Sequence, residues 1–585
     1  MSEKNMITVD LDDKGTLRKL LCDCLGIEAI NYYLNGDFTR NQLIGEDFDI
    51  YSSSQYKSYC VLLNLWRWVN KIANSSPYQN DLKGRLELLV ANMVNPAVGA
   101  YPSENHSLFY GAHLGNGGEP LEAPEANDDC GRLLFELAAE YYWILLIDPQ
   151  KEVNAFSLDD LLHETWSINL PQLIPLWEAL IKREGIQKYF PYSELSREVD
   201  NPQRLCSIHT VYIANPSTSS AGKGTAMQLI GGMVISALRA AIFFEESPKV
   251  GNLYTCLMAS LAAVEYALTA TPRETLWIAG MHGVILPDDD TVISGAKVWI
   301  KKGNGGSQPS ATCQSRESGT GETWGVGDIQ LATLLPYQLF DLQSVLDEKG
   351  EDFSLLDVKE FENAYADLRK QRDRCVQHVT LGLLLSDDSD HSLWFRWGTS
   401  LNPSGMGGST ELNPERDATL YKNVSELTVN QVDAWRRWID ILENAECEKI
   451  DLAMRKVVSA SNNRINPEDI LLDSVTAWEN LVGDRGETTF KVTTALGLLL
   501  GDKDESPRAI QDRCKKIYNT RSQLIHGSNQ KMQVGQLYQD SEDALEFAKR
   551  ALRKMLCERK DLLTLKEGGE RARALILGEI AGGDN

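Results

Sequence analysis

The stretch INPEDILLDSVTAWENLVGD, residues 465–484, determines the structural class of the C-terminal part of this chain. Its apolar residues recur at helical spacing between Pro467 and Val482, which predicts an amphipathic helix. As an N-cap, Asn466 can accept hydrogen bonds from the amides of the first turn. Pro467 is tolerated there because a first-turn amide has no partner inside the helix, so the missing N–H of proline costs nothing. We therefore expect a helix that begins at Pro467 and buries one face.

A second helix start, Ser506-Pro507, repeats this arrangement and predicts a helix that runs to His526. Gly527 follows and can adopt the left-handed conformation of a C-cap. Further helices are expected at Val429–Asn444, Lys449–Ser461, Thr488–Leu500 and Ser541–Asp561. Because the connections are short, residues 428–565 are predicted to form an all-α helical bundle, followed by a C-terminal tail at residues 566–585.

The rest of the chain divides near residue 200. Residues 1–200 are predicted to be mainly helical, because apolar residues recur at helical spacing in Tyr56–Ala73, Leu82–Met93, Gly131–Leu146 and Leu173–Arg183. Residues 201–425 are predicted to be mixed, with the β-branched and aromatic residues of strands at Ser207–Ala214, Thr291–Lys301 and Leu393–Thr399. The expected fold class is α+β and multidomain, with a mixed α/β N-terminal region ahead of the all-α bundle.

Length and composition limit the classes of protein to consider. A chain of 585 residues is too long to fold around a single hydrophobic core. Its net charge of −25 argues against a surface that binds nucleic acid non-specifically. The 11 cysteines include no CxxC pair and the 8 histidines show no zinc spacing, so we expect reduced thiols in the cytoplasm and no metal or cofactor. The apolar stretches Leu229–Phe244 and Leu253–Leu268 each hold one charged residue, which predicts buried helices and no membrane partner.

The segment IYNTRSQLIHG, residues 517–527, places Arg521 and His526 at the end of an expected helix. Five residues turn through roughly 140° on a helix, so the two side chains flank a groove and do not stack on one stripe. Cleavage of RNA needs a base for the 2′-hydroxyl, an acid for the leaving 5′-oxygen and a cation for the charged phosphorane. Histidine can serve as acid or base near neutral pH, and arginine can grip phosphate oxygens without a metal.

Positive charge gathers on the same helix. Pro507–His526 carries five cations against one acid, Asp512, a net charge of +4; the cations are Arg508, Arg513, Lys515, Lys516 and Arg521. The next expected helix adds Lys549, Arg550, Arg553, Lys554, Arg559 and Lys560. A basic region in an acidic chain is typical of a confined RNA site. We therefore expect RNA as a partner, with Arg513 and Lys516 among the groups that bind it.

Both quoted stretches together resemble the ApeA-like branch of HEPN domains, over roughly residues 430–565. The resemblance implies a helical bundle with an Arg-x4-6-His motif, which is a metal-independent ribonuclease in many members. It also implies a homodimer in which two motifs face each other, and a role in prokaryotic antiviral defence or toxin systems. Arg521 and His526 match the motif, Glu479 matches an acidic position of an earlier helix, and Ser522 stands where active members often have Asn, Asp or His.

The candidate site follows from these arguments. The catalytic candidates are Arg521, His526 and Glu479, and the substrate-binding candidates are Ser522, Tyr518, Arg513 and Lys516. Four of these residues have a structural alternative: Glu479 can pair with an arginine to fix helix packing, Tyr518 can be a core residue, and Arg521 with His526 can simply stabilise a helix end.

We hypothesise a metal-independent endoribonuclease whose N-terminal region senses a phage or cellular trigger. The alternative is a non-catalytic protein that binds RNA or nucleotides or acts as a scaffold. A third hypothesis places the main activity in residues 1–425. Weaker signals are a phosphate-loop-like AGKGT at 221–225, acidic runs at 288–290 and 387–390, and the pair Cys375 and His378 near an expected strand.

Overall fold

The computed structural model describes most of the chain beyond residue 208 and three short segments before it. The described residues are 120–124, 128–140, 173–189, 209–217, 220–244, 250–269, 271–288, 291–295, 297–303, 328–350, 353–387, 391–404, 410–412, 424–484, 488–526 and 533–578. The helices expected at Tyr56–Ala73 and Leu82–Met93, and the C-cap at Gly527, lie outside these residues.

A six-stranded antiparallel sheet forms the centre of the described middle region, in the order β10-β9-β3-β7-β6-β5. Its strands are β3 (Arg273–His282), β5 (Ile293–Ser294), β6 (Val298–Lys302), β7 (Ile329–Tyr337), β9 (Trp394–Ser400) and β10 (Thr410–Leu412). The single strand expected at Thr291–Lys301 is therefore a hairpin, in which the amide of Gly295 donates to the carbonyl of Val298 at 2.8 Å.

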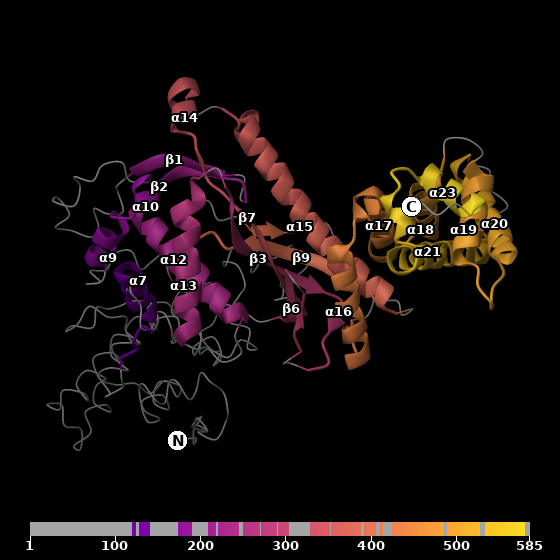
Figure 1. Ribbon diagram of the computed structural model, residues 1–585, viewed down its shortest axis with the longest axis horizontal. Coiled ribbons are helices and arrows are strands. Elements are labelled where there is room, and N and C mark those ends of the chain that lie inside the picture. The colour runs from indigo at the N-terminus through magenta and orange to yellow at the C-terminus, as the bar shows by residue number, and fades with distance from the viewer. Residues whose placement is uncertain are drawn as a thin grey trace, which may run out of the picture.

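Helices cover both faces of this sheet, as Figure 1 shows. Successive residues of β3 point to opposite faces. Trp277 joins a core with α15 (Lys359–Ser386) and α16 (Val429–Asn444), whereas Ile278 joins a core with Phe243 of α12 (Ala226–Phe244). Next to α12 lies α13 (Val250–Ala267). The prediction that the two apolar stretches form helices is thus confirmed; α12 is largely buried, whereas α13 buries one face and leaves Tyr266 exposed. Among the described residues, no helix has the length and apolar character needed to cross a membrane.

Smaller elements surround the sheet. Strands β1 (His209–Asn215), β2 (Ser220–Thr225) and β8 (Phe340–Asp341) form a three-stranded sheet, and β4 (Val284–Ile285) pairs with β11 (Ser425–Glu426). The remaining helices here are α7 (Asp129–Ala139), α9 (Leu173–Leu180), α10 (Glu184–Gln187), α14 (Gln343–Lys349) and the short η7 (Leu355–Asp357). Arg183 donates to Asp128 at 2.8 Å and to Glu265 at 2.8 Å, which ties α7 and α10 to α13.

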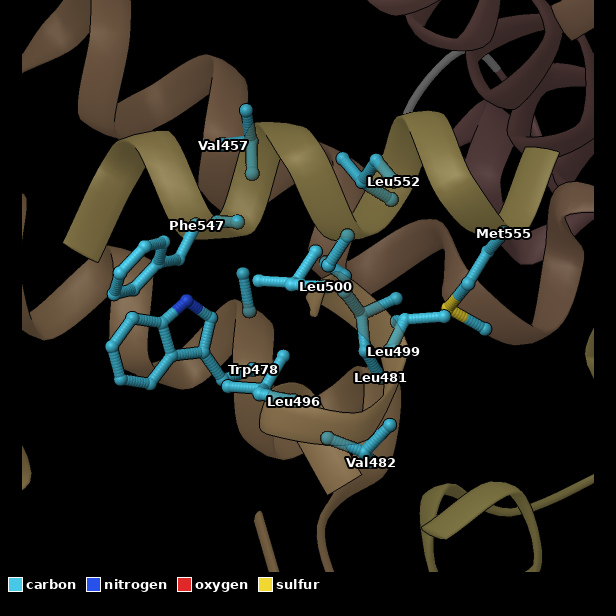
Figure 2. Packing of buried hydrophobic residues seen from close by; sticks show 14 of the residues in the cluster. Val457, Trp478, Leu481, Val482, Leu496, Leu499, Leu500, Phe547, Leu552 and Met555 are labelled. Carbon is cyan, nitrogen blue, oxygen red and sulfur yellow. The ribbon is translucent and has the colours of Figure 1, made fainter. Parts of the chain in front are cut away.

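The C-terminal region is a helical bundle. Its elements are η9 (Cys447–Ile450), α17 (Asp451–Val458), the π-turn η10 (Ser459–Asn463), α18 (Pro467–Val482), α19 (Thr488–Leu500), α20 (Pro507–Ile525), α21 (Val534–Cys557), α22 (Asp561–Thr564) and α23 (Gly568–Leu577). Figure 2 shows part of the core, where Trp478 of α18 lies against Phe547 of α21. The described chain is therefore mixed helix and sheet in its middle and helical at its C-terminal end.

Local capping explains the helix starts that the sequence predicted. Asn466 Oδ1 accepts from the amide of Glu468 at 3.0 Å, and Ser506 Oγ accepts from the amide of Ala509 at 3.2 Å. Both caps precede a proline in the first turn, where its missing N–H costs nothing.

Three expected boundaries are wrong. The helix expected at Lys449–Ser461 is broken into η9, α17 and η10, and the one expected at Ser541–Asp561 begins at Val534. The segment assigned to a tail contains α23, whose buried Arg571 donates to the carbonyls of Leu481 at 2.6 Å and Asn480 at 2.7 Å. These bonds attach α23 to the end of α18, so the bundle continues to residue 577.

Side chains of the bundle also bind the middle region. Arg553 on α21 donates to the carbonyls of Leu385 at 3.1 Å and Asp387 at 2.6 Å, at the C-terminal end of α15. Asn462 of η10 donates to the carbonyl of Leu393 at 2.8 Å. These contacts join the bundle to the end of the sheet region, and they leave α19 and α20 at the end of the molecule farthest from α12 and α13 (Figure 1).

Candidate functional site

Two helices, α18 and α20, bring three of the predicted site residues together. Tyr518 and Arg521 stand one turn apart on α20, and both contact Glu479 of α18. The hydroxyl of Tyr518 donates to Glu479 Oε1, and Arg521 Nη2 lies 3.5 Å from each of the two carboxylate oxygens. The guanidinium carbon of Arg521 is 5.6 Å from the centre of the Tyr518 ring. The structural alternative for Glu479, an ion pair with an arginine, is therefore present, and the arginine is Arg521.

Arg521 is only loosely held. Its side chain is 26% exposed and that of Glu479 is 27% exposed, so solvent screens the pair. A single guanidinium nitrogen engages the carboxylate, and Nε is buried without a hydrogen-bond partner among the described residues. Most of the N–H donors of the Arg521 guanidinium therefore make no hydrogen bond within the described part of the chain.

Tyr518 is placed differently from its expected role. Its ring belongs to the bundle core and the residue is 6% exposed, so no ring face is open to a base. Burial raises the pKa of the Tyr518 hydroxyl far above its usual range, and Glu479 raises it further. Of the two roles that the sequence left open for Tyr518, substrate binding is therefore corrected in favour of the alternative: Tyr518 is a packed core residue whose protonated hydroxyl donates to Glu479.

His526 stands at the C-terminal end of α20. Its amide donates to the carbonyl of Ser522 at 3.1 Å, and its imidazole is exposed. Within the described residues the ring makes no hydrogen bond or ion pair. Five residues separate it from Arg521, so the two side chains leave the helix roughly 140° apart. The structure brings Arg521, Glu479 and Tyr518 together, whereas no hydrogen bond or ion pair joins His526 to these three described residues.

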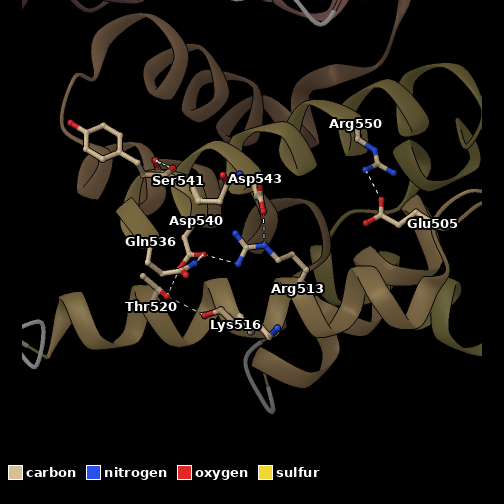
Figure 3. Close-up of polar contacts among 11 residues, drawn as sticks. Glu505, Arg513, Lys516, Thr520, Gln536, Asp540, Ser541, Asp543 and Arg550 are labelled. Atoms are coloured by element: carbon tan, nitrogen blue, oxygen red, sulfur yellow. Dashed lines mark hydrogen bonds and ion pairs between the residues drawn. The ribbon is translucent and has the colours of Figure 1, made fainter. Parts of the chain in front are cut away.

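Arg513 is a structural residue (Figure 3). Its Nη1 donates to Asp540 Oδ1 at 2.6 Å and its Nε donates to Asp543 Oδ2 at 2.5 Å, both on α21. Although burial opposes the charged form, these two carboxylates raise the pKa of Arg513 above its ordinary value. Asp540 also accepts from Thr520 at 2.6 Å and Gln536 at 2.7 Å. The expectation that Arg513 binds substrate is therefore corrected, because its donors already serve the α20–α21 contact.

Lys516 is exposed and Ser522 is half-buried, so their substrate-binding roles stay predictions. Several of the cations of α21 and its C-terminal end are engaged within the fold. Arg550 pairs with Glu505 at 3.0 Å, Lys554 with Glu558 at 2.9 Å, and Arg559 with Asp561 at 2.7 Å. The charge count along the sequence therefore overstates the positive charge that is free to bind a ligand.

Other sequence signals lie in structural positions. The AGKGT segment forms most of strand β2, so it is no phosphate loop. Cys375 and His378 lie within the long helix α15, where Cys375 contacts Thr333 of the neighbouring strand β7. Burial raises the pKa of the Cys375 thiol to about 12, while burial and Arg374 lower the pKa of His378 to about 4. A protonated thiol beside a neutral imidazole is no activated nucleophile.

The acidic runs are described only in part. Asp387 Oδ2 accepts from Gln431 at 2.6 Å and lies 3.3 Å from His391 Nε2, whereas residues 289–290 and 388–390 lie outside the described residues. Across the described ranges, no group of three or more His, Cys, Asp or Glu side chains is arranged to hold a metal ion.

The comparisons with known proteins leave the family open. No family model, no curated protein and no solved structure matches this chain.

Proposed function

We propose that the C-terminal bundle is a metal-independent endoribonuclease of the HEPN type, in which Arg521 binds the scissile phosphate and His526 transfers protons. One observation carries this proposal: a loosely paired arginine lies in the last turns of the helix that ends at an exposed histidine. An imidazole that solvent and a ligand can reach can accept or donate a proton. An arginine with unused donors can grip a phosphate.

The proposed reaction needs only these groups and the RNA itself. A neutral imidazole takes the proton of a 2′-hydroxyl, and the 2′-oxygen forms a bond to phosphorus. The bond from phosphorus to the 5′-oxygen breaks, and a protonated imidazole supplies the proton of the leaving oxygen. The products are a 2′,3′-cyclic phosphate and a 5′-hydroxyl. Arg521 stabilises the additional negative charge of the phosphorane.

The divergence of Arg521 and His526 bears on how such a site is assembled. Side chains about 140° apart on one helix reach different sides of a phosphate. A second copy of the chain can supply the missing acid or base, so the proposal includes a homodimer in which two α20 ends meet. Glu479 then acts as a positioning residue that sets the direction of Arg521. In this proposal the N-terminal region responds to a trigger in prokaryotic antiviral defence or in a toxin system.

The test uses the purified full chain, RNA and EDTA, with the RNA ends mapped after incubation. We expect cleavage with cyclic phosphate ends, and a loss of about 100-fold or more in rate for His526→Ala, the range typical of a missing general acid or base. Lys560→Ala is the control, because Lys560 is exposed and lies between α21 and α22. Unchanged cleavage in both His526→Ala and Arg521→Ala would refute the proposal.

A non-catalytic binding protein is the second candidate. It is favoured by the ion pair between Arg521 and Glu479, since an arginine paired with a carboxylate also serves to fix helix packing. RNA binding without cleavage by the wild-type chain would support this candidate. Full activity of a fragment that ends near residue 425 would place the main activity in the N-terminal region.

A further inference from the structure

An open groove of about 660 Å³ runs between α19 and α20. The two helices approach closely because of Gly497, where a Cβ atom would stand 2.5 Å from the carbonyl oxygen of Pro507. Any larger residue would force the start of α20 away from α19. Phe490, Arg508 and Lys515 are among the residues that line the groove.

One face of α20 continues from this groove to the candidate site. Positions 508, 515, 522 and 526 fall within about 40° of one another around the helix axis, counting 100° per residue. Arg508, Lys515 and His526 are exposed and Ser522 is half-buried. Arg508 and His526 are 18 residues apart, a rise of about 27 Å. This distance accommodates several nucleotides of an extended strand.

The cations on this face differ from the other arginines of α20. Arg513 and Arg521 pair with carboxylates of neighbouring helices, whereas Arg508 and Lys515 form no ion pair with any described residue. Arg508 also occupies the first turn of α20, which contains no acidic residue. A cation in the first turn opposes the helix dipole. Its position is therefore unfavourable for helix stability and favourable for an anionic ligand.

An aromatic side chain completes the groove. Phe490 of α19 is 62% exposed, which is unusual for a large apolar ring and gives it an open face for a base. Beside it, Thr494 accepts from Gln511 at 2.6 Å, so polar groups line the floor. Asp512 also lines the groove, and its negative charge weakens the attraction of the groove for phosphate. Two free cations, a stackable ring and polar groups fit one ligand class, single-stranded nucleic acid.

We infer that the groove between α19 and α20 binds single-stranded RNA and guides it along α20 towards His526. This inference deepens the proposed function, because the same RNA would be the substrate. Arg508 and Lys515 bind successive phosphates, and Phe490 stacks on a base. The contacts are made to the backbone and to a base face, so they select single strands without selecting a sequence.

The test measures binding separately from cleavage. The probe is a single-stranded 2′-O-methyl oligoribonucleotide, which has no 2′-hydroxyl to attack its phosphate and so remains intact whatever His526 does. Its anisotropy is followed with the full chain at several salt concentrations. The double variant Arg508→Ala, Lys515→Ala should bind at least tenfold more weakly. Its slope of log K against log salt should be shallower by about 1.4, since each phosphate contact on a single strand contributes about 0.7.

Single variants and a control sharpen this test. Phe490→Ala should bind about five- to tenfold more weakly, the lower range for base stacking on a partly exposed ring. Asp512→Asn should bind about two- to threefold more tightly, because it removes a repulsive charge. Lys560→Ala removes one exposed cation outside the groove and should bind within about twofold of the wild type.

The outcomes for the groove and for the nuclease differ. Undiminished binding by the double variant, or no RNA binding by the wild type, overturns the groove even if His526→Ala abolishes cleavage. Weakened binding by the double variant, together with full cleavage of unmodified RNA by His526→Ala, supports the groove and overturns the proposed nuclease. If the double variant differs from the wild type in sedimentation but binds RNA equally well, the groove is a protein interface, and the inference is again overturned.

Discussion

Arg513 and Arg521 lie on the same helix, yet the fold uses them in different ways. Arg513 donates to two carboxylates at 2.5 Å and 2.6 Å, and one of these, on Asp540, is only 2% exposed. Among the described residues, Arg521 has one carboxylate partner, at 3.5 Å, and both members of that pair are about a quarter exposed. Buried charges need their partners, whereas exposed ones lose little when a partner leaves. Arg513 is therefore committed to packing, and Arg521 keeps the freedom that a binding role requires.

The largest effect should come from breaking the tight cluster at Asp540. Asp540→Ala leaves Arg513, Thr520 and Gln536 without their shared acceptor, and removing one partner of a buried pair typically costs about 3–5 kcal/mol. Urea unfolding measures the change in the free energy of unfolding, and hydrogen exchange measures the local change in α20 and α21. Asp543→Ala is the control with a smaller expected loss, because that carboxylate is 28% exposed. Equal losses in the two variants would contradict a distinction based on burial.

A second tight cluster, around Asp473, extends the comparison to the dependence of stability on pH. Asp473 on α18 accepts from Lys456 at 2.6 Å, Arg464 at 2.9 Å and Ser459 at 2.8 Å. Although burial favours the neutral form, these three bonds lower the pKa of Asp473 below its ordinary value of 3.8. Its stabilisation is therefore present above about pH 4 and is lost as the pH falls through the lowered folded-state pKa.

Asp473→Asn should accordingly cost about 1–3 kcal/mol at neutral pH, the range for hydrogen bonds to a charged group. The difference from the wild type should shrink gradually as the pH falls from about 4 through the lowered native-state pKa, because the carboxyl is protonated first in the unfolded chain and then in the native one. Urea unfolding at a series of pH values measures it. A difference that stays constant down to pH 2 would mean that Asp473 does not act through its charge.

Local signals and distant pairings explain which parts of this structure the sequence could predict. Helices α16, α18 and α19 begin and end at the residues expected, because caps and periodicity are properties of neighbouring residues. The start of α21 was placed too late, since Gln533 provides no side-chain cap to mark it. The partners of Arg513 are 27 and 30 residues away, and nothing local identifies them. Arg521 and His526 were selected by their motif and Glu479 by the family resemblance, but only the structure separates loosely held groups from committed ones.

The loose pair should respond much less than the tight clusters. Arg521→Ala is expected to cost about 0.5–1 kcal/mol, because a partly exposed pair at 3.5 Å is weak. Glu479→Gln should cost no more than this, since an amide oxygen can still accept from Tyr518. Urea unfolding of both variants measures the cost. A loss near that of Asp540→Ala would make Arg521 a packing residue and remove the contrast with Arg513.

The smallest effect on stability is expected for His526→Ala, within about 0.5 kcal/mol, because an exposed ring without partners in the described chain contributes little. This position offers the cleanest separation of folding from function. Cleavage measured beside urea unfolding should show a large loss of rate in a variant that is as stable as the wild type. A loss of activity accompanied by a comparable loss of stability would mean that His526 caps α20 and does not transfer protons. Substitution by Asn, which can still bond helix-end carbonyls but cannot act as an acid or base, decides between these two roles.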